Sequence, residues 1–429
     1  MLNNSIHILY LQRIESTAMT TKKGFTTTLL HSDRLKKPEH GALHKPIHTS
    51  VTYGYDDVQD LVDIFQNKKS GFAYSRQGNP TVSALEHKVT QMENGFATIC
   101  FSTGMAAISS TVIALIKHGD HILASSFLFG NTRSVFQSFM DMGIDITFTD
   151  ATSVENIKGG LKPNTKMVFV ETIANPATQI ADLEAIGNLC QEKGIIYMVD
   201  NTMTSPYLFK PIDVKASLVI NSLTKYIGGH GNALGGSITD TGLFNWAYFT
   251  NIFEGFKTQV KPENLGITQI RKKGLRDAGG TLAPEAAHSL SVGSETLALR
   301  MERSCNNALA LANYFEGHPN IKKVFYPGIL THPQHNMAKK LFKSFGSLMS
   351  IELDEKLDCF PFLNKLQLVV KSSNLGDTRT LAIPVAHTIF NELGPQKRAE
   401  MGISDNLIRL SIGIEDIEDL MEDFKVALG

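Results

Sequence analysis

The chain has 429 residues, of which 42% are hydrophobic and 19% are charged, a composition typical of a globular protein large enough for two domains. Its 41 basic and 42 acidic residues leave a formal net charge of −1, which argues against nucleic acid or an anionic membrane as a partner. No apolar run is long enough to cross a bilayer, and the four cysteines are far apart without metal-ligand spacing. We therefore expect a cytoplasmic protein with free thiols and no metal site.

The N-terminal part, residues 1–80, is expected to be an extension and an arm. Residues 1–18 show no convincing secretion signal, and Met19 is followed by a stretch that resembles a natural start. Asn79-Pro80 then supplies a helix cap and a proline for the first turn. Apolar residues at helical spacing follow, which predicts a helix from Pro80 onward.

Short apolar runs alternate with helical patterns through the next part, residues 81–290, which we expect to be the large domain. Such alternation predicts a mostly parallel sheet covered by helices, with ligands beyond the carboxyl ends of the strands. The predicted strands are Ala97–Phe101, His121–Ser125, Asp145–Thr149, Met167–Val170, Ile195–Val199 and Leu218–Ile220.

The pattern changes towards the C-terminus. Residues 242–283 are rich in Gly and Phe and weakly periodic, which predicts a long loop near the domain junction. A long amphipathic helix is expected after Glu295. The strand-like runs 323–326, 348–352, 366–370 and 407–412 then predict a smaller α+β domain over residues 291–429.

Two polar residues follow neighbouring strands where a ligand is expected. Asp200 follows one buried run, and Lys225 follows the next. The hydroxyls of Ser222 and Thr224 lie beside Lys225 in the sequence. A carboxylate there can hold a pyridine nitrogen protonated, while a lysine can form an imine with an aldehyde cofactor. Taken singly, however, an Asp after a strand is more often a helix cap, and a strand-end Lys is usually a solvated surface group.

A turn of small residues at Gly104-Met105 enters a predicted helix, where free backbone N–H groups favour a phosphate. By itself, this turn is equally consistent with a plain strand-to-helix connection. The charge-neutral composition means that any phosphate must be bound by such local features.

Five motifs together resemble the Cys/Met-metabolism family of pyridoxal-5'-phosphate (PLP) enzymes. They occur in the family's order, and the resemblance runs from about Gly24 to the C-terminus. The motifs are Tyr74-Ser75-Arg76-Gln77-Gly78-Asn79-Pro80, Gly104-Met105-Ala106, Glu171-Thr172 with Asn175-Pro176, Val199-Asp200-Asn201-Thr202 and Ser222-Leu223-Thr224-Lys225. The resemblance implies an α/β fold of the fold-type I, aspartate-aminotransferase-like class, with PLP as the cofactor.

The resemblance also implies roles for individual residues. Lys225 is expected to hold PLP as a Schiff base and shuttle protons, and Asp200 to pair with the pyridinium nitrogen. The remaining cofactor-binding residues are expected to be Tyr74, Arg76, Gly104, Met105, Phe129, Thr202, Ser222 and Thr224. The substrate is expected to meet Asn175, Asn374 and Arg409, with Arg409 clamping its α-carboxylate.

The Tyr74-x-Arg76 loop implies an oligomer. In this family these two residues reach the phosphate of the neighbouring subunit, so their presence implies a homodimer with shared active sites, usually doubled to a tetramer.

Two departures from the family pattern affect the expected site. Phe129 stands where many members have a tyrosine stacked on the cofactor, so the ring is kept but the phenol proton is lost. Residues 381–390, Leu-Ala-Ile-Pro-Val-Ala-His-Thr-Ile-Phe, replace a more polar family pattern at the expected substrate-side wall.

Within the family, residues 275–280 and 293–303 look like those of O-acetylhomoserine sulfhydrylases. The resemblance thus implies conversion of O-acetyl-L-homoserine and sulfide into L-homocysteine and acetate, as in methionine biosynthesis by direct sulfhydrylation. Methionine γ-lyase and cystathionine synthase or lyase chemistry remain alternatives on the same scaffold, as does a non-catalytic PLP-binding protein.

An NAD-dependent dehydrogenase is a remote alternative. Gly228-Gly229-His230-Gly231 resembles a glycine turn, but it follows the predicted strands instead of opening a helix after the first one.

Overall fold

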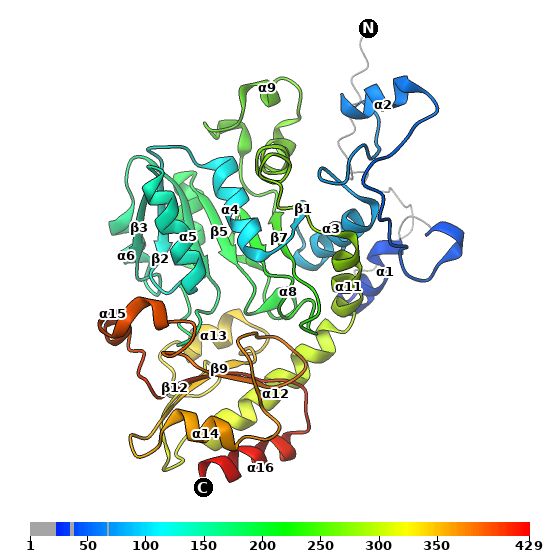
Figure 1. The fold of residues 1–429 in the computed structure, drawn as a ribbon. Helices are drawn as coiled ribbons and strands as arrows, with labels where there is room; N and C mark the ends of the chain where they lie inside the picture. Colours follow the sequence, from blue (N-terminus) through cyan, green and yellow to red (C-terminus); the bar gives the residue numbers. More distant parts are fainter. Residues whose placement is uncertain (1–22, 35–37, 67) are drawn as a thin grey trace.

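The computed structural model describes residues 23–34, 38–66 and 68–429. The expected start at Met19 and the extension 1–18 lie outside these residues. Two sheets, one above the other in Figure 1, are connected by the long helix α12 (Leu297–Phe315) that was predicted after Glu295.

The larger sheet has seven strands in the order β1-β7-β6-β5-β4-β2-β3. The strands are β1 Ala97–Phe101, β2 His121–Ser125, β3 Asp145–Thr149, β4 Thr165–Glu171, β5 Ile196–Asp200, β6 Leu218–Asn221 and β7 Gly236–Asp240. All six predicted strands are therefore confirmed. Strands β3, β2, β4, β5 and β6 run parallel, whereas β7 lies antiparallel between β6 and β1.

Helices cover both faces of this sheet because alternate strand residues point to opposite sides. In β4, Val168 and Val170 pack in one apolar cluster with α3, while Met167 and Phe169 pack in another with α4 and α5. The helices of this part are α3 Pro80–Glu93, α4 Gly104–Leu115, α5 Gly130–Asp141, α6 Val154–Gly160, α7 Leu183–Lys193 and α8 Ser205–Leu208, with the 3₁₀ turn η3 Pro211–Val214.

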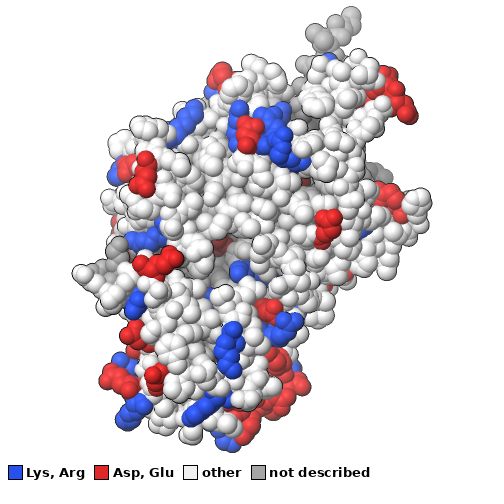
Figure 2. Space-filling view, viewed as in Figure 1, with Lys and Arg blue, Asp and Glu red and all other residues white. Residues whose placement is uncertain are grey.

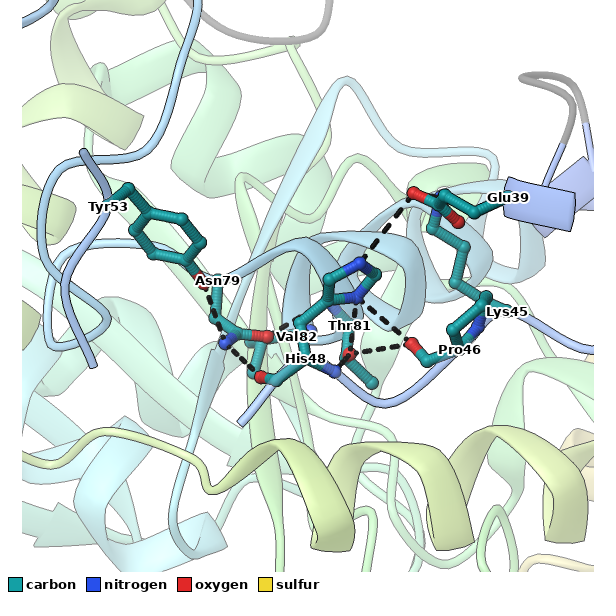
Figure 3. A network of polar contacts seen from close by, with 8 residues as sticks. All are labelled: Glu39, Lys45, Pro46, His48, Tyr53, Asn79, Thr81 and Val82. Atoms are coloured by element: carbon teal, nitrogen blue, oxygen red, sulfur yellow. Dashed lines mark hydrogen bonds and ion pairs between the residues drawn. The ribbon is translucent and has the colours of Figure 1, made fainter. Parts of the chain in front are cut away.

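The N-terminal arm is tied to the start of α3, as Figure 3 shows. Asn79 caps α3 with its Oδ1, as the sequence predicted, and its Nδ2 donates to the carbonyl of His48 at 2.7 Å. Thr81 Oγ1 accepts the His48 N–H and donates to Pro46. The arm holds the short elements α1 Phe25–His31, η1 Ser32–Arg34, η2 Glu39–Gly41 and α2 Val58–Phe65.

The prediction of a long loop over residues 242–283 was wrong for much of that range. It forms the short elements η4 Trp246–Tyr248, α9 Glu254–Lys257, η5 Pro262–Asn264, α10 Leu265–Gln269 and the π-helical η6 Ile270–Arg276, before α11 Pro284–Ser294. Trp246, Phe256 and Ile270 are buried on the α4 side of the large sheet. Elements of three to seven residues are too short to show a clear helical period, so apolar packing determines them.

The C-terminal sheet has the order β10-β11-β12-β9-β8. Its strands are β8 Ile321–Phe325, β9 Leu348–Leu353, β10 Val370–Lys371, β11 Leu381–Pro384 and β12 Leu407–Ser411, and its other elements are α13 His335–Leu341, α14 Cys359–Lys365, η7 Asn391–Leu393, α15 Gly394–Glu400 and α16 Ile417–Leu428.

The prediction of a strand over residues 366–370 was wrong, because only Val370 and Lys371 pair with a neighbouring strand. The carboxylate of Asp423 accepts the backbone N–H groups of the three preceding residues, 367–369, in place of a neighbouring strand.

Lys and Arg are interspersed with Asp and Glu over the face shown in Figure 2. Across the described ranges, no helix has the length and apolarity needed to cross a membrane. In the same ranges, no group of three or more His, Cys, Asp or Glu side chains gathers as a metal site.

Candidate active site

The carboxyl ends of β5 and β6 bring together most of the expected cofactor residues. Asp200 ends β5, and its Oδ1 accepts the backbone N–H of Thr202 at 2.9 Å. Thr202 Oγ1 in turn accepts the N–H of Ser222, just after β6, at 2.8 Å. Gly104 begins α4 so close by that a Cβ there would lie 3.1 Å from Ser222 Cβ. A side chain at position 104 would therefore narrow the cradle formed by Ser222 and the N-terminus of α4, where Thr103 takes the N–H of Ala106 and leaves those of Gly104 and Met105 for a ligand.

Asp200 is half-buried, and its carboxyl has a neutral donor. Burial raises its pKa, opposed by the hydrogen bonds from Thr202. Glu171 lies opposite Asp200 in the neighbouring strand β4, and burial followed by the Asp200 charge raises the pKa of Glu171. Two neighbouring carboxyls whose pKa values are both raised favour a cationic ligand, because a positive charge would offset the cost of ionising Asp200.

Lys225 lies in the turn after β6, against the C-terminal segment that carries Asn374. Its Nζ donates to Asn374 Oδ1 at 2.6 Å, and a Cβ on Gly376 would lie 2.6 Å from the backbone nitrogen of Tyr226. Burial, followed by the charge of Arg409, lowers the pKa of Lys225 to about 8. A sizeable neutral fraction near physiological pH makes this amine a usable nucleophile and base.

Arg409 is buried in the middle of β12, only 2% exposed. Its Nη2 donates to the carbonyls of Ser373 and Asn374 at 2.8 and 2.9 Å, while its Nε has no partner. Burial lowers its pKa to about 10, so keeping the guanidinium charged without an anionic partner costs free energy. An anionic ligand would relieve that cost, which fits the expected role in binding a substrate carboxylate.

Arg409→Ala is expected to raise the KM for the amino-acid substrate about 10- to 100-fold, the usual loss when a charged hydrogen bond to a ligand is removed. The visible absorption of the bound cofactor should change much less than the KM, since Arg409 contacts the loop carrying Asn374 and not the cradle. Steady-state kinetics and a spectrum test this, with the exposed Arg303→Ala as control. An altered spectrum at normal KM would contradict the role, and Arg409→Lys serves if the alanine variant does not fold.

Phe129 precedes the first turn of α5. Its backbone N–H donates to Glu171 Oε1 at 2.8 Å, so a carboxyl from β4 holds the backbone just before this helix, which has no side-chain cap of its own. Sequence reasoning assigned Glu171 no role, although its place at the end of a strand beside Asp200 was an available signal. Glu171 therefore connects the aromatic residue expected over the cofactor with the carboxyl expected under its nitrogen.

Other expected residues are arranged differently. Tyr74 and Arg76 make no recorded contact with Lys225, and Arg76 Nη1 donates to the carbonyl of Arg276. The Thr224 hydroxyl donates to the carbonyl of Gly235 and accepts the N–H of the same residue. The Asn175 side chain is buried and its Oδ1 has no partner. Met105, in the first turn of α4, receives the Thr132 hydroxyl at its Sδ.

Arg300 on α12 is a second residue that sequence reasoning overlooked. Its guanidinium donates to the carbonyls of Tyr226 and Ile227, directly after Lys225, and to Gly293. It holds the lysine turn against the junction helix, and a charged residue on the apolar face of a helix was the available signal.

The comparisons with known proteins agree with this geometry. The family model for Cys/Met metabolism PLP-dependent enzymes matches residues 26–429. The chain belongs to that family. It is 36% identical to an L-methionine gamma-lyase of Fusobacterium nucleatum, over 96% of this chain and 99% of that protein, and 35% identical to the homocysteine synthase of Schizosaccharomyces pombe, over 94% and 98%.

One solved structure of the same family is a candidate O-acetylhomoserine (thiol)-lyase from Campylobacter jejuni, which contains a pyridoxyl-lysine phosphate. It is 29% identical, with a TM-score of 0.89, over 95% of this chain and 100% of that one. The fold-type I class is thus confirmed, and the cofactor is PLP.

The described residues fit PLP. Asp200 is a half-buried carboxyl suited to a pyridinium, the Gly104–Ser222 cradle suits a phosphate, and Lys225 is a desolvated amine suited to an aldehyde. The individual roles of these residues stay predictions.

Proposed function

We propose that the enzyme catalyses γ-replacement on O-acetyl-L-homoserine with sulfide, releasing acetate and forming L-homocysteine. The observation that carries this choice is Phe129, whose backbone N–H is held by Glu171 at the position where the ring is expected to stack on the cofactor. The TM-score of 0.89 to the candidate O-acetylhomoserine (thiol)-lyase, against 0.82 to a cystathionine gamma-lyase, supports the same choice.

Phe129 bears on the leaving group because it has no proton to give. A carboxyl has a pKa of about 4 and a thiol one of about 8.5, so acetate departs as a stable anion whereas a thiolate benefits from an acid. A site without a phenol therefore favours an ester substrate over a thioether.

The chain's own residues divide the remaining work. Arg409 binds the substrate α-carboxylate. The side-chain oxygen of Asn374 accepts a hydrogen bond from the Lys225 amine and holds that amine until the substrate displaces it. The neutral Lys225 amine then removes the α-proton and later returns protons to the carbon chain. Bound PLP supplies an electron-poor ring that takes up the charge left on the α-carbon, and Asp200 keeps that ring protonated.

γ-Elimination from L-methionine is the second candidate, favoured by the 34–36% identity to L-methionine gamma-lyases of Fusobacterium and Treponema. Purified protein given O-acetyl-L-homoserine with sulfide should form homocysteine. The same protein given L-methionine alone should release little ammonia or 2-oxo acid. Absence of homocysteine from the acetyl ester, with release of 2-oxo acid from methionine, would replace the first proposal by the second.

Phe129→Tyr is expected to raise thioether elimination about tenfold or more, because the phenol restores a proton donor for a thiolate. Turnover of the acetyl ester should change less than about threefold, since acetate needs no proton. Rates with both substrates test this, and Phe127→Tyr in the same loop is a matched control. Equal changes with both substrates would contradict the argument.

We also propose that the chain works as a homodimer, and as a tetramer of two dimers, with Tyr74 and Arg76 reaching a second copy. Both residues belong to the N-terminal arm, and neither contacts the chain's own Lys225 turn. We propose, too, that the chain divides at about residues 80 and 290 into the N-terminal arm, the large domain and the C-terminal domain.

A further inference from the structure

Glu93 is a buried carboxyl that the reaction does not use. It is the last residue of α3, is fully buried and lies beneath the carboxyl ends of β5 and β6. Its Oε1 accepts two amide hydrogen bonds, from Asn201 Nδ2 at 3.0 Å and from Asn221 Nδ2 at 2.6 Å.

Both amides belong to neighbours of cofactor residues. Asn201 directly follows Asp200, and Asn221 directly precedes Ser222. Asp200 is the expected partner of the PLP nitrogen, and Ser222 forms one side of the phosphate cradle. A single carboxyl thus joins the two strand ends that must hold opposite ends of one rigid ring.

We propose that Glu93 is a positioning residue that sets the spacing between Asp200 and Ser222, and that it does so as a neutral carboxylic acid paired with Asn221. The second oxygen of Glu93 and the side-chain oxygen of Asn221 are both buried, and neither has a hydrogen-bond partner among the described residues. A proton on Glu93 Oε2 supplies the donor that Asn221 Oδ1 is missing, which closes a ring of two hydrogen bonds between acid and amide.

The electrostatic surroundings agree with a neutral acid. Burial raises the pKa of Glu93 to about 7, opposed by the hydrogen bonds of Asn201 and Asn221 and by the charge of Lys210. The side chains that bond to this carboxyl are uncharged: Asn201 also donates to Phe209, and its Oδ1 accepts the Thr204 hydroxyl. Lys210 donates instead to the Met92 carbonyl and to Asn94 Oδ1 on either side of Glu93. Ionising the buried Glu93 would therefore cost more free energy than sharing its proton with Asn221.

Two variants of Glu93 and one control separate positioning from mere packing. Glu93→Gln keeps the ring, because its amide can donate to Asn221 and its oxygen can accept as before. Glu93→Leu fills the space without hydrogen bonds. The control, Thr90→Val, removes a buried hydroxyl from the same helix that bonds to Thr98 on β1, away from β5 and β6.

The readouts are the rate of PLP loss from the holoenzyme on dialysis and the visible absorption band, with thermal unfolding as the measure of the fold. Glu93→Leu should lose PLP at least about tenfold faster with a shifted band. Glu93→Gln should stay within about twofold of the wild type with an unchanged band. Thr90→Val should lower the unfolding temperature while PLP loss and band stay unchanged.

Normal PLP retention and band in Glu93→Leu would overturn the positioning role. A Glu93→Gln variant as impaired as Glu93→Leu would overturn the neutral acid pair. If the leucine variant does not fold, Glu93→Asp, which withdraws the carboxyl by one methylene, takes its place with the same expected direction. These outcomes do not depend on which γ-substrate the enzyme uses.

Discussion

Lys225→Ala is expected to abolish turnover, with a loss of at least about 10³-fold, because one amine serves as both cofactor anchor and proton carrier. Borohydride treatment should then leave PLP unattached, whereas in the wild type it should fix PLP at position 225. The lowered pKa of Lys225 and its bond to Asn374 identify it as the desolvated amine of the site.

Peptide mass analysis after reduction measures the attachment, and an assay with O-acetyl-L-homoserine and sulfide measures the rate. The exposed Lys117→Ala is the matched control and should keep both properties. Substantial residual activity, or PLP fixed at another lysine, would show that Lys225 does not carry the cofactor.

Asp200→Asn is expected to lower kcat about 10² to 10³-fold, the usual cost of removing one stabilising group from developing charge. An amide cannot hold the pyridine nitrogen protonated, so the ring withdraws less charge from the α-carbon. The fold should survive, because Asn keeps an oxygen for the Thr202 N–H.

α-Proton exchange of the substrate in deuterated water isolates this step from release of the leaving group. Asp213→Asn, at an exposed position of the turn η3, is the control and should exchange normally. Near-normal exchange in Asp200→Asn would mean that another group, with Glu171 as the neighbouring carboxyl, keeps the nitrogen protonated.

The sequence determined the part of the fold that local patterns encode. Buried runs with alternating faces identified β1 to β6, and the parallel order explained why Asp200 and the turn with Lys225 would meet at one edge. The cap at Asn79 was equally readable, because its carboxamide bonds to residues only two and three positions away.

The tertiary structure decided what depends on distant chain segments. Lys225 meets Asn374 across 149 residues, and Glu93 reaches Asn201 and Asn221 across more than a hundred. Residues 367–369 are not in a strand, although they resemble one, because Asp423 takes their N–H groups. A side-chain acceptor that comes from a distant part of the chain produces no periodic pattern in the sequence. Only the tertiary structure therefore shows which buried polar group it satisfies.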